Sequence, residues 1–149
     1  MMDYPIEDIF YRSPDDLLLH ARFYASAGNS RPAVCLPGLT RNGRDFHDLA
    51  LALSRDPVSP RDVYTVDFRG RGLSAWDADW KNYSPYTESL DVEALMTARG
   101  LEDAAVIGTS RGGIVAMLLS VLRPSVMGVA VLNDIGPVIE TAGLARIMG

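Results

Sequence analysis

The sequence is poor in the residues that build metal sites and disulfide frameworks. Among its 149 residues are one cysteine, Cys35, and two histidines, His20 and His47. A single cysteine excludes an internal disulfide bond and is consistent with a reducing compartment. The three positions show no metal-ligand spacing, so we expect no metal site.

Features of nucleic-acid-binding and membrane proteins are also scarce. The formal net charge is −5, so the chain offers no basic surface for nucleic acid. The longest apolar run, residues 114–122, is too short to span a bilayer, and the first residues show no signal-peptide pattern. The glycine-rich stretches match neither common nucleotide-binding motif. We therefore expect a soluble, cytoplasmic protein that binds no nucleic acid, membrane or cofactor.

Apolar runs and turn residues alternate along the chain in an order typical of an α/β protein. The hydrophobic content of 48% is that of a globular domain. Strands are predicted at residues 6–12, 17–24, 33–36, 63–66, 104–107 and 126–132. Helices are predicted at residues 45–54, 86–99 and 114–122. We expect a mostly parallel sheet with helices on both faces. In the first helix, the spacing places four apolar residues on one face: Phe46, Leu49, Ala50 and Leu53.

The most informative motif is the sequence Gly-Thr-Ser-Arg-Gly at residues 108–112. It lies between a predicted strand and a predicted helix, the context in which this pattern forms a nucleophile elbow. In such a turn, side chains two residues before and after the serine would clash, and Gly108 and Gly112 meet that requirement. The following helix N-terminus favours negative charge beside Ser110. The alternative interpretation is an ordinary glycine-rich turn.

Three other polar turns are predicted at the same edge of the sheet, where the parallel strands end. They are residues 37–39, 67–72 and 133–137. In the second turn, Asp67 is predicted to cap loop amides, and Arg69 and Arg71 to tie loops together rather than bind phosphate. The aromatic residues of the loop that follows either line a cleft or pack the loop: Trp76, Trp80 and Tyr83.

These motifs make the chain similar to the N-terminal portion of the α/β-hydrolase family. Residues 36–40 resemble that family's oxyanion loop, residues 66–74 its D-x-R-G-x-G-x-S loop, and residues 108–113 its nucleophile elbow. More narrowly, the chain resembles the cap-bearing bacterial branch that includes small esterases and carbon–carbon bond hydrolases. The resemblance implies an α/β-hydrolase fold truncated after the sixth strand. Residues 1–136 would then belong to the core, and residues 137–149 would begin a cap segment.

The resemblance also implies roles for individual residues. Ser110 is the expected nucleophile, and the backbone N–H groups of Leu39 and Arg111 are the expected oxyanion donors. The Arg111 side chain is expected to pair with an unspecified acid. Asp134 is either the catalytic acid, in a position that a minority of the family uses, or a loop residue leading into the cap. The family's catalytic histidine follows the last strand, but no histidine follows Ser110 here.

The resemblance therefore implies a serine hydrolase of small molecules that acts on an ester or similarly activated carbonyl and is incomplete in this chain. One alternative is a non-catalytic binding protein or an inactive fragment that retains the scaffold. Another is haloperoxidase-type or lyase chemistry on the same fold. Since the strand at residues 126–132 would be an apolar sheet edge, self-association through it is also expected.

Overall fold

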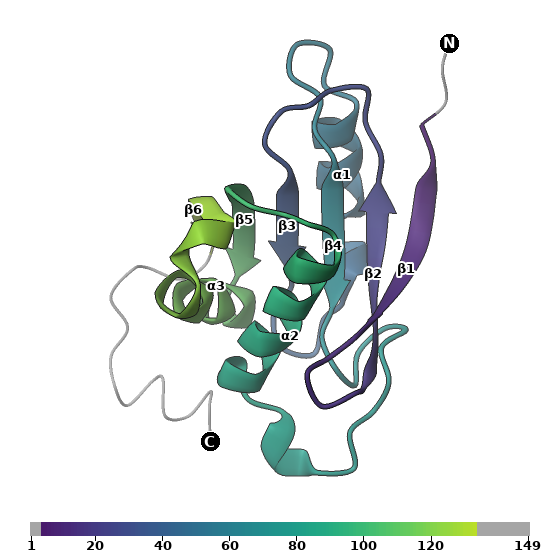
Figure 1. Ribbon diagram of the computed structural model, residues 1–149. Coiled ribbons are helices and arrows are strands. Elements are labelled where there is room, and N and C mark those ends of the chain that lie inside the picture. The colour runs from purple at the N-terminus through teal and green to yellow at the C-terminus, as the bar shows by residue number, and fades with distance from the viewer. Residues whose placement is uncertain (1–3, 134–149) are drawn as a thin grey trace.

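The computed structural model describes residues 4–133, which form a six-stranded sheet with helices on both faces (Figure 1). The strands are β1 (Ile6–Arg12), β2 (Leu18–Tyr24), β3 (Ala33–Leu36), β4 (Val63–Asp67), β5 (Ala104–Thr109) and β6 (Met127–Asn133). The helices are α1 (His47–Ser54), α2 (Pro85–Ala98) and α3 (Arg111–Leu122). Three short 3-10 turns are η1 (Gly43–Phe46), η2 (Trp80–Asn82) and η3 (Pro124–Val126). None of the helices within the described residues is long and apolar enough to cross a membrane.

The strand order confirms the predicted, mostly parallel sheet. Its order is β1-β2-β4-β3-β5-β6. Two pairings are antiparallel: β1 with β2, and β2 with β4. The other three are parallel: β3 with β4, β3 with β5, and β5 with β6. The carboxyl ends of β3, β4 and β5 therefore lie at one edge, the lower edge in Figure 1. The loops that leave this edge are the ones that the sequence marks as functional.

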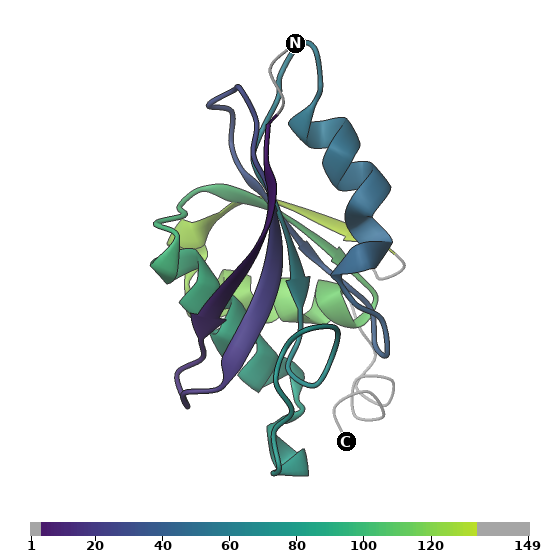
Figure 2. The same cartoon turned by 90° about the vertical axis from the view of Figure 1, so that its right-hand side faces the viewer.

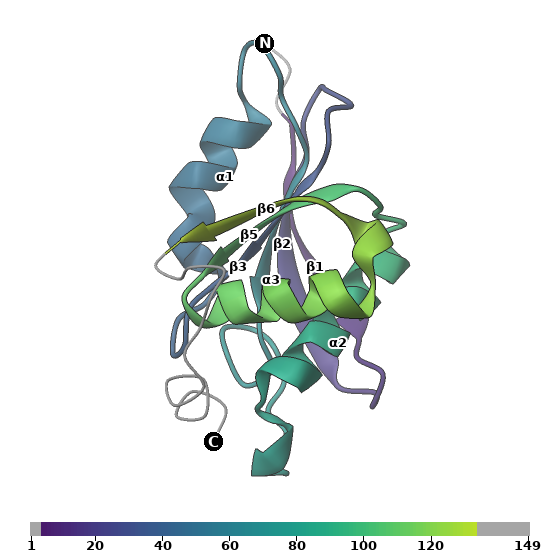
Figure 3. The same cartoon turned by 90° about the vertical axis from the view of Figure 1, so that its left-hand side faces the viewer.

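Two hydrophobic cores lie on opposite faces of the sheet. Figures 2 and 3 show α1 on one side of the sheet and α2 and α3 on the other. In β3, Val34 and Leu36 join the core under α2 and α3, while Ala33 and Cys35 join the core under α1. Because both faces are covered, the whole strand is apolar instead of alternating with polar residues.

Leu49, on the predicted apolar face of the first helix, is not buried with Phe46 and Ala50. The chain first forms the 3-10 turn η1, so that α1 begins only at His47. From there the buried positions of α1 are Ala50 and Ser54, one helical turn apart, and Leu49 is 40% exposed. A 3-10 turn has about three residues per turn, so it shifts the phase of the buried face relative to one continuous α-helix.

The strand β6 lies at the edge of the described sheet, as predicted. Two of its apolar side chains, Val129 and Val131, are 41% and 48% exposed. Self-association through this edge stays a prediction. Asp134 and the predicted cap segment, residues 137–149, lie outside the described residues.

Candidate active site

The backbone at Ser110 has the strained geometry expected of a nucleophile elbow. β5 ends at Thr109, α3 begins at Arg111, and Ser110 between them has φ +52° and ψ −112°. A positive φ is uncommon for a residue with a side chain and persists only where neighbouring structure holds it. The Ser110 N–H donates to the Asn133 carbonyl at 2.9 Å, and the Gly113 N–H donates to the Ser110 carbonyl at 2.9 Å. The Ser110 residue itself is exposed to solvent.

The two motif glycines are required because backbone lies where their side chains would be. A Cβ atom on Gly108 would lie 2.6 Å from the carbonyl carbon of Gly112. A Cβ atom on Gly112 would lie 2.6 Å from the carbonyl carbon of Leu36 and 2.8 Å from the carbonyl oxygen of Pro37. These contacts are shorter than van der Waals distances, so only hydrogen fits at both positions. The close approach joins β3, the elbow and the start of α3.

Replacing Gly112 with alanine is expected to destabilise the fold by about 3 kcal/mol, because backbone atoms must move to accept the methyl group. Gly100 is the matched control, since it has φ +64° but open space around its Cβ position. Gly100→Ala should lower the free energy of unfolding by about 1 kcal/mol, because only the strain of a positive φ is added there. Urea unfolding of both variants measures the difference. Equal losses would show that steric contact at Gly112 is not what fixes the elbow.

The loop after β3, residues 37–42, lies against the elbow. A Cβ atom on Gly38 would lie 3.8 Å from the Ser110 Cβ and 3.7 Å from the Thr109 carbonyl oxygen. The Arg41 N–H donates to the Gly38 carbonyl at 3.1 Å, and Thr40 has φ +66°, so the loop is a tight turn. Leu39, next to Gly38, is half exposed. The turn thus carries the Leu39 amide to the vicinity of Ser110, whereas the Arg111 amide follows the serine directly.

The Arg111 side chain is buried and pairs with an acid from α2. Its Nε and Nη2 atoms each lie 2.7 Å from Glu88 Oε1, and Nη2 also donates to the Tyr83 carbonyl at 3.1 Å. Both side chains are 5% exposed. Burial raises the pKa of Glu88, although the Arg111 charge and hydrogen bond oppose this rise. The pair anchors the start of α3 to α2 and identifies the acid that the sequence left unspecified.

A hollow of about 230 Å³ lies beside these elements and is called here the elbow hollow. Its walls come from the loop after β3, from the loop after β4 and from the Arg111–Glu88 pair. Trp80 and Tyr83 line it, in agreement with the cleft interpretation of these aromatic residues, while Trp76 is 75% exposed and is not a lining residue. Arg71 and Lys81 bring positive charge to the same walls. The hollow therefore combines aromatic surface, positive charge and backbone amides.

The Asp67 carboxylate caps loop amides, as the sequence predicts. Its Oδ1 accepts the Gly43 N–H at 2.8 Å, and its Oδ2 accepts the Leu73 N–H at 3.0 Å. Arg69 ties loops through three carboxylates, those of Asp15, Asp77 and Asp91. Both residues are therefore structural in the described part of the chain. Within residues 4–133, no group of three or more His, Cys, Asp or Glu side chains could hold a metal ion.

Both histidines lie on the α1 face of the sheet. His20 on β2 is buried between two carboxylates, with Nδ1 2.7 Å from Asp67 Oδ2 and Nε2 2.8 Å from Asp8 Oδ1. His47 Nδ1 lies 2.7 Å from the Tyr24 hydroxyl oxygen. Neither histidine lines the elbow hollow. Ser110 is not among the lining residues of that hollow either, but both histidines hold the partners named above, so no histidine of the described residues is assigned as a general base for Ser110.

The carboxylates around His20 make stability depend on pH. Burial lowers the pKa of His20, but the hydrogen bonds that it donates to both carboxylates, together with their negative charge, outweigh this effect and raise it above 6.5. The folded state therefore holds the proton more tightly than the unfolded state. The stabilisation is fully present below about pH 6.5, the unfolded pKa, and is lost as pH rises through the folded pKa.

The expected result is that the free energy of unfolding falls between pH 6.5 and pH 9 in the wild type and changes less in His20→Gln. His47→Gln, at the other histidine, should keep the wild-type slope. Urea titrations across this pH range measure how the free energy of unfolding of each variant changes with pH. A slope that survives in His20→Gln would assign the pH dependence to another group.

Comparisons with known proteins agree with this geometry. The family model described as "Alpha/beta hydrolase family" matches residues 33–148. The chain is 37% identical over 132 residues to a 3-hydroxybutyrate-oligomer hydrolase of Cupriavidus necator, a match that covers 87% of this chain and 44% of that protein. It is 33% identical over 116 residues to the lipase LipV of Mycobacterium tuberculosis, which covers 78% of this chain and 41% of that protein.

A solved structure is similar over nearly the whole chain. It is an alpha/beta hydrolase from Novosphingobium aromaticivorans, with 43% sequence identity and a TM-score of 0.82. The match covers 99% of this chain and 50% of that one. The chain thus spans half or less of the length of these similar proteins.

Proposed function

The chain belongs to the alpha/beta hydrolase family, and on that premise we propose that it carries the nucleophile and oxyanion donors of a serine hydrolase. The substrate is an ester or a similarly activated carbonyl compound. The observation that carries the proposal is the exposed, positive-φ Ser110 between β5 and α3, with the Gly38 turn packed against it. Backbone strain of this kind is stored at functional sites because it orients a reactive group.

In the proposed first step, the Ser110 Oγ attacks the carbonyl carbon while its proton passes to a general base. The carbonyl oxygen becomes negative and accepts hydrogen bonds from the Leu39 and Arg111 amides. Loss of one such donor typically costs about 3 kcal/mol of barrier. The tetrahedral intermediate then expels the alcohol, which takes the proton from the base. Water then releases the acyl group. The base takes a proton from the water as its oxygen attacks the acyl carbon, and the Ser110 Oγ leaves and takes up that proton.

The general base is proposed to be a histidine outside residues 1–149. His20 and His47 face the α1 side and hold other partners, so neither is assigned this role. Asp134 remains a candidate for the acid that orients the base, with a loop role as its alternative. In the active protein, Asp134→Asn with unchanged turnover would leave only the loop role.

Hydrolysis of an ester is supported by the names of two relatives, an oligomer hydrolase and a lipase. The elbow hollow supports a compact substrate, because apolar surface from Leu39 and Trp80 lies beside the positive charges of Arg71 and Lys81. Such a surface suits a short acyl chain with a polar or anionic end more than a long hydrocarbon.

The test is hydrolysis of p-nitrophenyl butyrate by the protein expressed from its natural reading frame. We expect saturable release of p-nitrophenol, with weaker turnover of the palmitate ester. The absence of turnover would favour the second candidate, a binding protein that keeps the hydrolase scaffold. That candidate is favoured by one observation: both histidines of residues 4–133 hold other partners, His20 two carboxylates and His47 the Tyr24 hydroxyl.

A further inference from the structure

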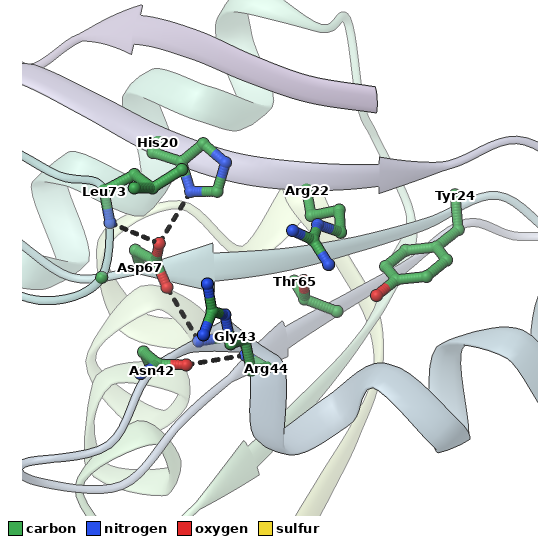
Figure 4. A pocket seen from close by; sticks show the side chains of 10 residues that line it. His20, Arg22, Tyr24, Asn42, Gly43, Arg44, Thr65, Asp67 and Leu73 are labelled. Atoms are coloured by element: carbon green, nitrogen blue, oxygen red, sulfur yellow. Dashed lines mark hydrogen bonds and ion pairs between the residues drawn. The ribbon is translucent and has the colours of Figure 1, made fainter. Parts of the chain in front are cut away.

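A second hollow of about 230 Å³ lies on the opposite face of the sheet, between β2 and the start of α1. It is called here the β2 hollow, and Figure 4 shows its lining. Arg22 and Tyr24 reach it from β2, Thr65 from β4, and Arg44 from η1. In Figure 4 the Arg22 and Arg44 side chains extend into the same space from opposite sides. No step of ester cleavage uses these residues.

The acids near this hollow already have hydrogen-bond donors of their own. Asp67 accepts hydrogen bonds from the Gly43 and Leu73 amides and from His20. Asp8 accepts from the other nitrogen of His20 and, at 3.4 Å, from the Nε of Arg22. Hydrogen bonds from His20 help to lower the pKa of both carboxylates, so both are ionised and occupied.

The two arginines, by contrast, have N–H groups that are not engaged by a carboxylate. Among the described residues, Arg44 forms no ion pair, whereas Arg22 pairs with Asp8 through its Nε at 3.4 Å and shares a hydrogen bond with the Tyr24 hydroxyl. In Figure 4 the remaining part of the Arg22 guanidinium faces the hollow. Two guanidinium groups beside one hollow repel each other, and an anion between them would relieve that repulsion. The protein has a net charge of −5, so this concentration of positive charge is local.

We propose that the β2 hollow binds a phosphate or phosphomonoester dianion. A guanidinium presents a planar fork of donors that matches phosphate oxygens, so Arg44 and the N–H groups that Arg22 has left could both bind the same anion. Thr65 also lines the hollow and carries a hydroxyl group, whereas the Tyr24 hydroxyl is already bonded to His47. The volume accommodates an ion of this size together with water.

The site is separate from the elbow hollow but shares a loop with it. Gly72 and Leu73 line the β2 hollow, whereas Phe68 and Arg71 of the same loop line the elbow hollow. A bound phosphate would therefore stabilise one end of a loop whose other end lies at the proposed substrate site. The binding itself does not depend on ester cleavage and is tested without it.

The experiment is calorimetric titration of inorganic phosphate into the wild type, Arg44→Gln and Arg55→Gln at low ionic strength. Arg44 is exposed and forms no side-chain ion pair among the described residues, so its loss should not unfold the protein. Arg55, an exposed arginine at the other end of α1, is the matched control. We expect Arg44→Gln to weaken phosphate binding roughly tenfold or more and Arg55→Gln to leave it unchanged.

Three outcomes would overturn the proposal. They are no detectable phosphate binding by the wild type, equal binding by wild type and Arg44→Gln, and binding of succinate as tight as that of phosphate. The last would assign the hollow to carboxylates instead. Arg22→Gln provides a second variant from another element, and circular dichroism of each variant confirms that a loss reflects the site and not unfolding.

Discussion

Ser110→Ala is expected to lower kcat/KM for p-nitrophenyl butyrate by about 10⁴-fold or more in the active protein. Alanine removes the attacking oxygen, whereas the glycines that shape the elbow remain. The backbone amides of Leu39 and Arg111 also remain, so some residual rate over water is expected. KM should change little, because the serine hydroxyl contributes to the reaction more than to ground-state binding. Steady-state kinetics with the purified variant measures both parameters.

The control for this variant is Ser120→Ala. Ser120 is an exposed serine of α3, the helix that follows Ser110, and its hydroxyl donates to the Met117 carbonyl at 2.6 Å. Its loss should leave kcat/KM within about twofold of the wild type, because surface substitutions of this kind rarely exceed 0.5 kcal/mol. If Ser110→Ala also kept wild-type activity, a different nucleophile would have to act.

Arg69→Met is expected to lower the free energy of unfolding by about 4 kcal/mol. The Arg69 side chain is fully buried and forms a two-pronged pair with Asp91 through Nε and Nη2, at 2.8 and 2.7 Å. Its Nη1 lies 2.8 Å from Asp77 and 2.9 Å from Asp15. Methionine fills much of the volume but leaves the three carboxylates without their common cation.

Removing the Arg69 charge should destabilise the fold mainly through Asp91, because the Asp91 side chain is only 3% exposed. Burial already raises its pKa despite the Arg69 hydrogen bonds, so without the arginine it should take up a proton. Arg12→Met is the matched control, because Arg12 and Asp16 form an exposed pair at 3.8 Å. That change should cost less than about 1 kcal/mol. Similar losses in the two urea titrations would mean that the Arg69 network does not hold the loops.

The strand order and the elbow follow closely from the sequence because their signals are local. Apolar runs identify the parallel strands, and Gly108, Gly112 and the serine between them fit one turn geometry only. The elbow also explains why α3 begins at Arg111 rather than at the predicted Ile114. The first helical turn carries two glycines for close packing, and these weaken the helical pattern at that point.

The polar partners could not be predicted, because they join residues that are distant in the chain. The buried positions of α2 include Glu88 and Asp91, whose arginine partners lie 23 and 22 residues away. His20 and Asp67 are 47 residues apart and meet because β2 and β4 pair with these residues in register. The rule that charged residues of a helix lie on its exposed face therefore fails where a residue distant in the chain supplies the opposite charge.

The proposed serine-hydrolase function depends most directly on the reactivity of Ser110. The protein expressed from its natural reading frame is treated with a fluorophosphonate, which loses fluoride as it bonds to an activated serine oxygen, and is then digested and sequenced by mass spectrometry. One phosphonyl group on Ser110, absent after denaturation before treatment, is the predicted result. An unmodified Ser110, or a label on another serine, would contradict its assignment as the nucleophile.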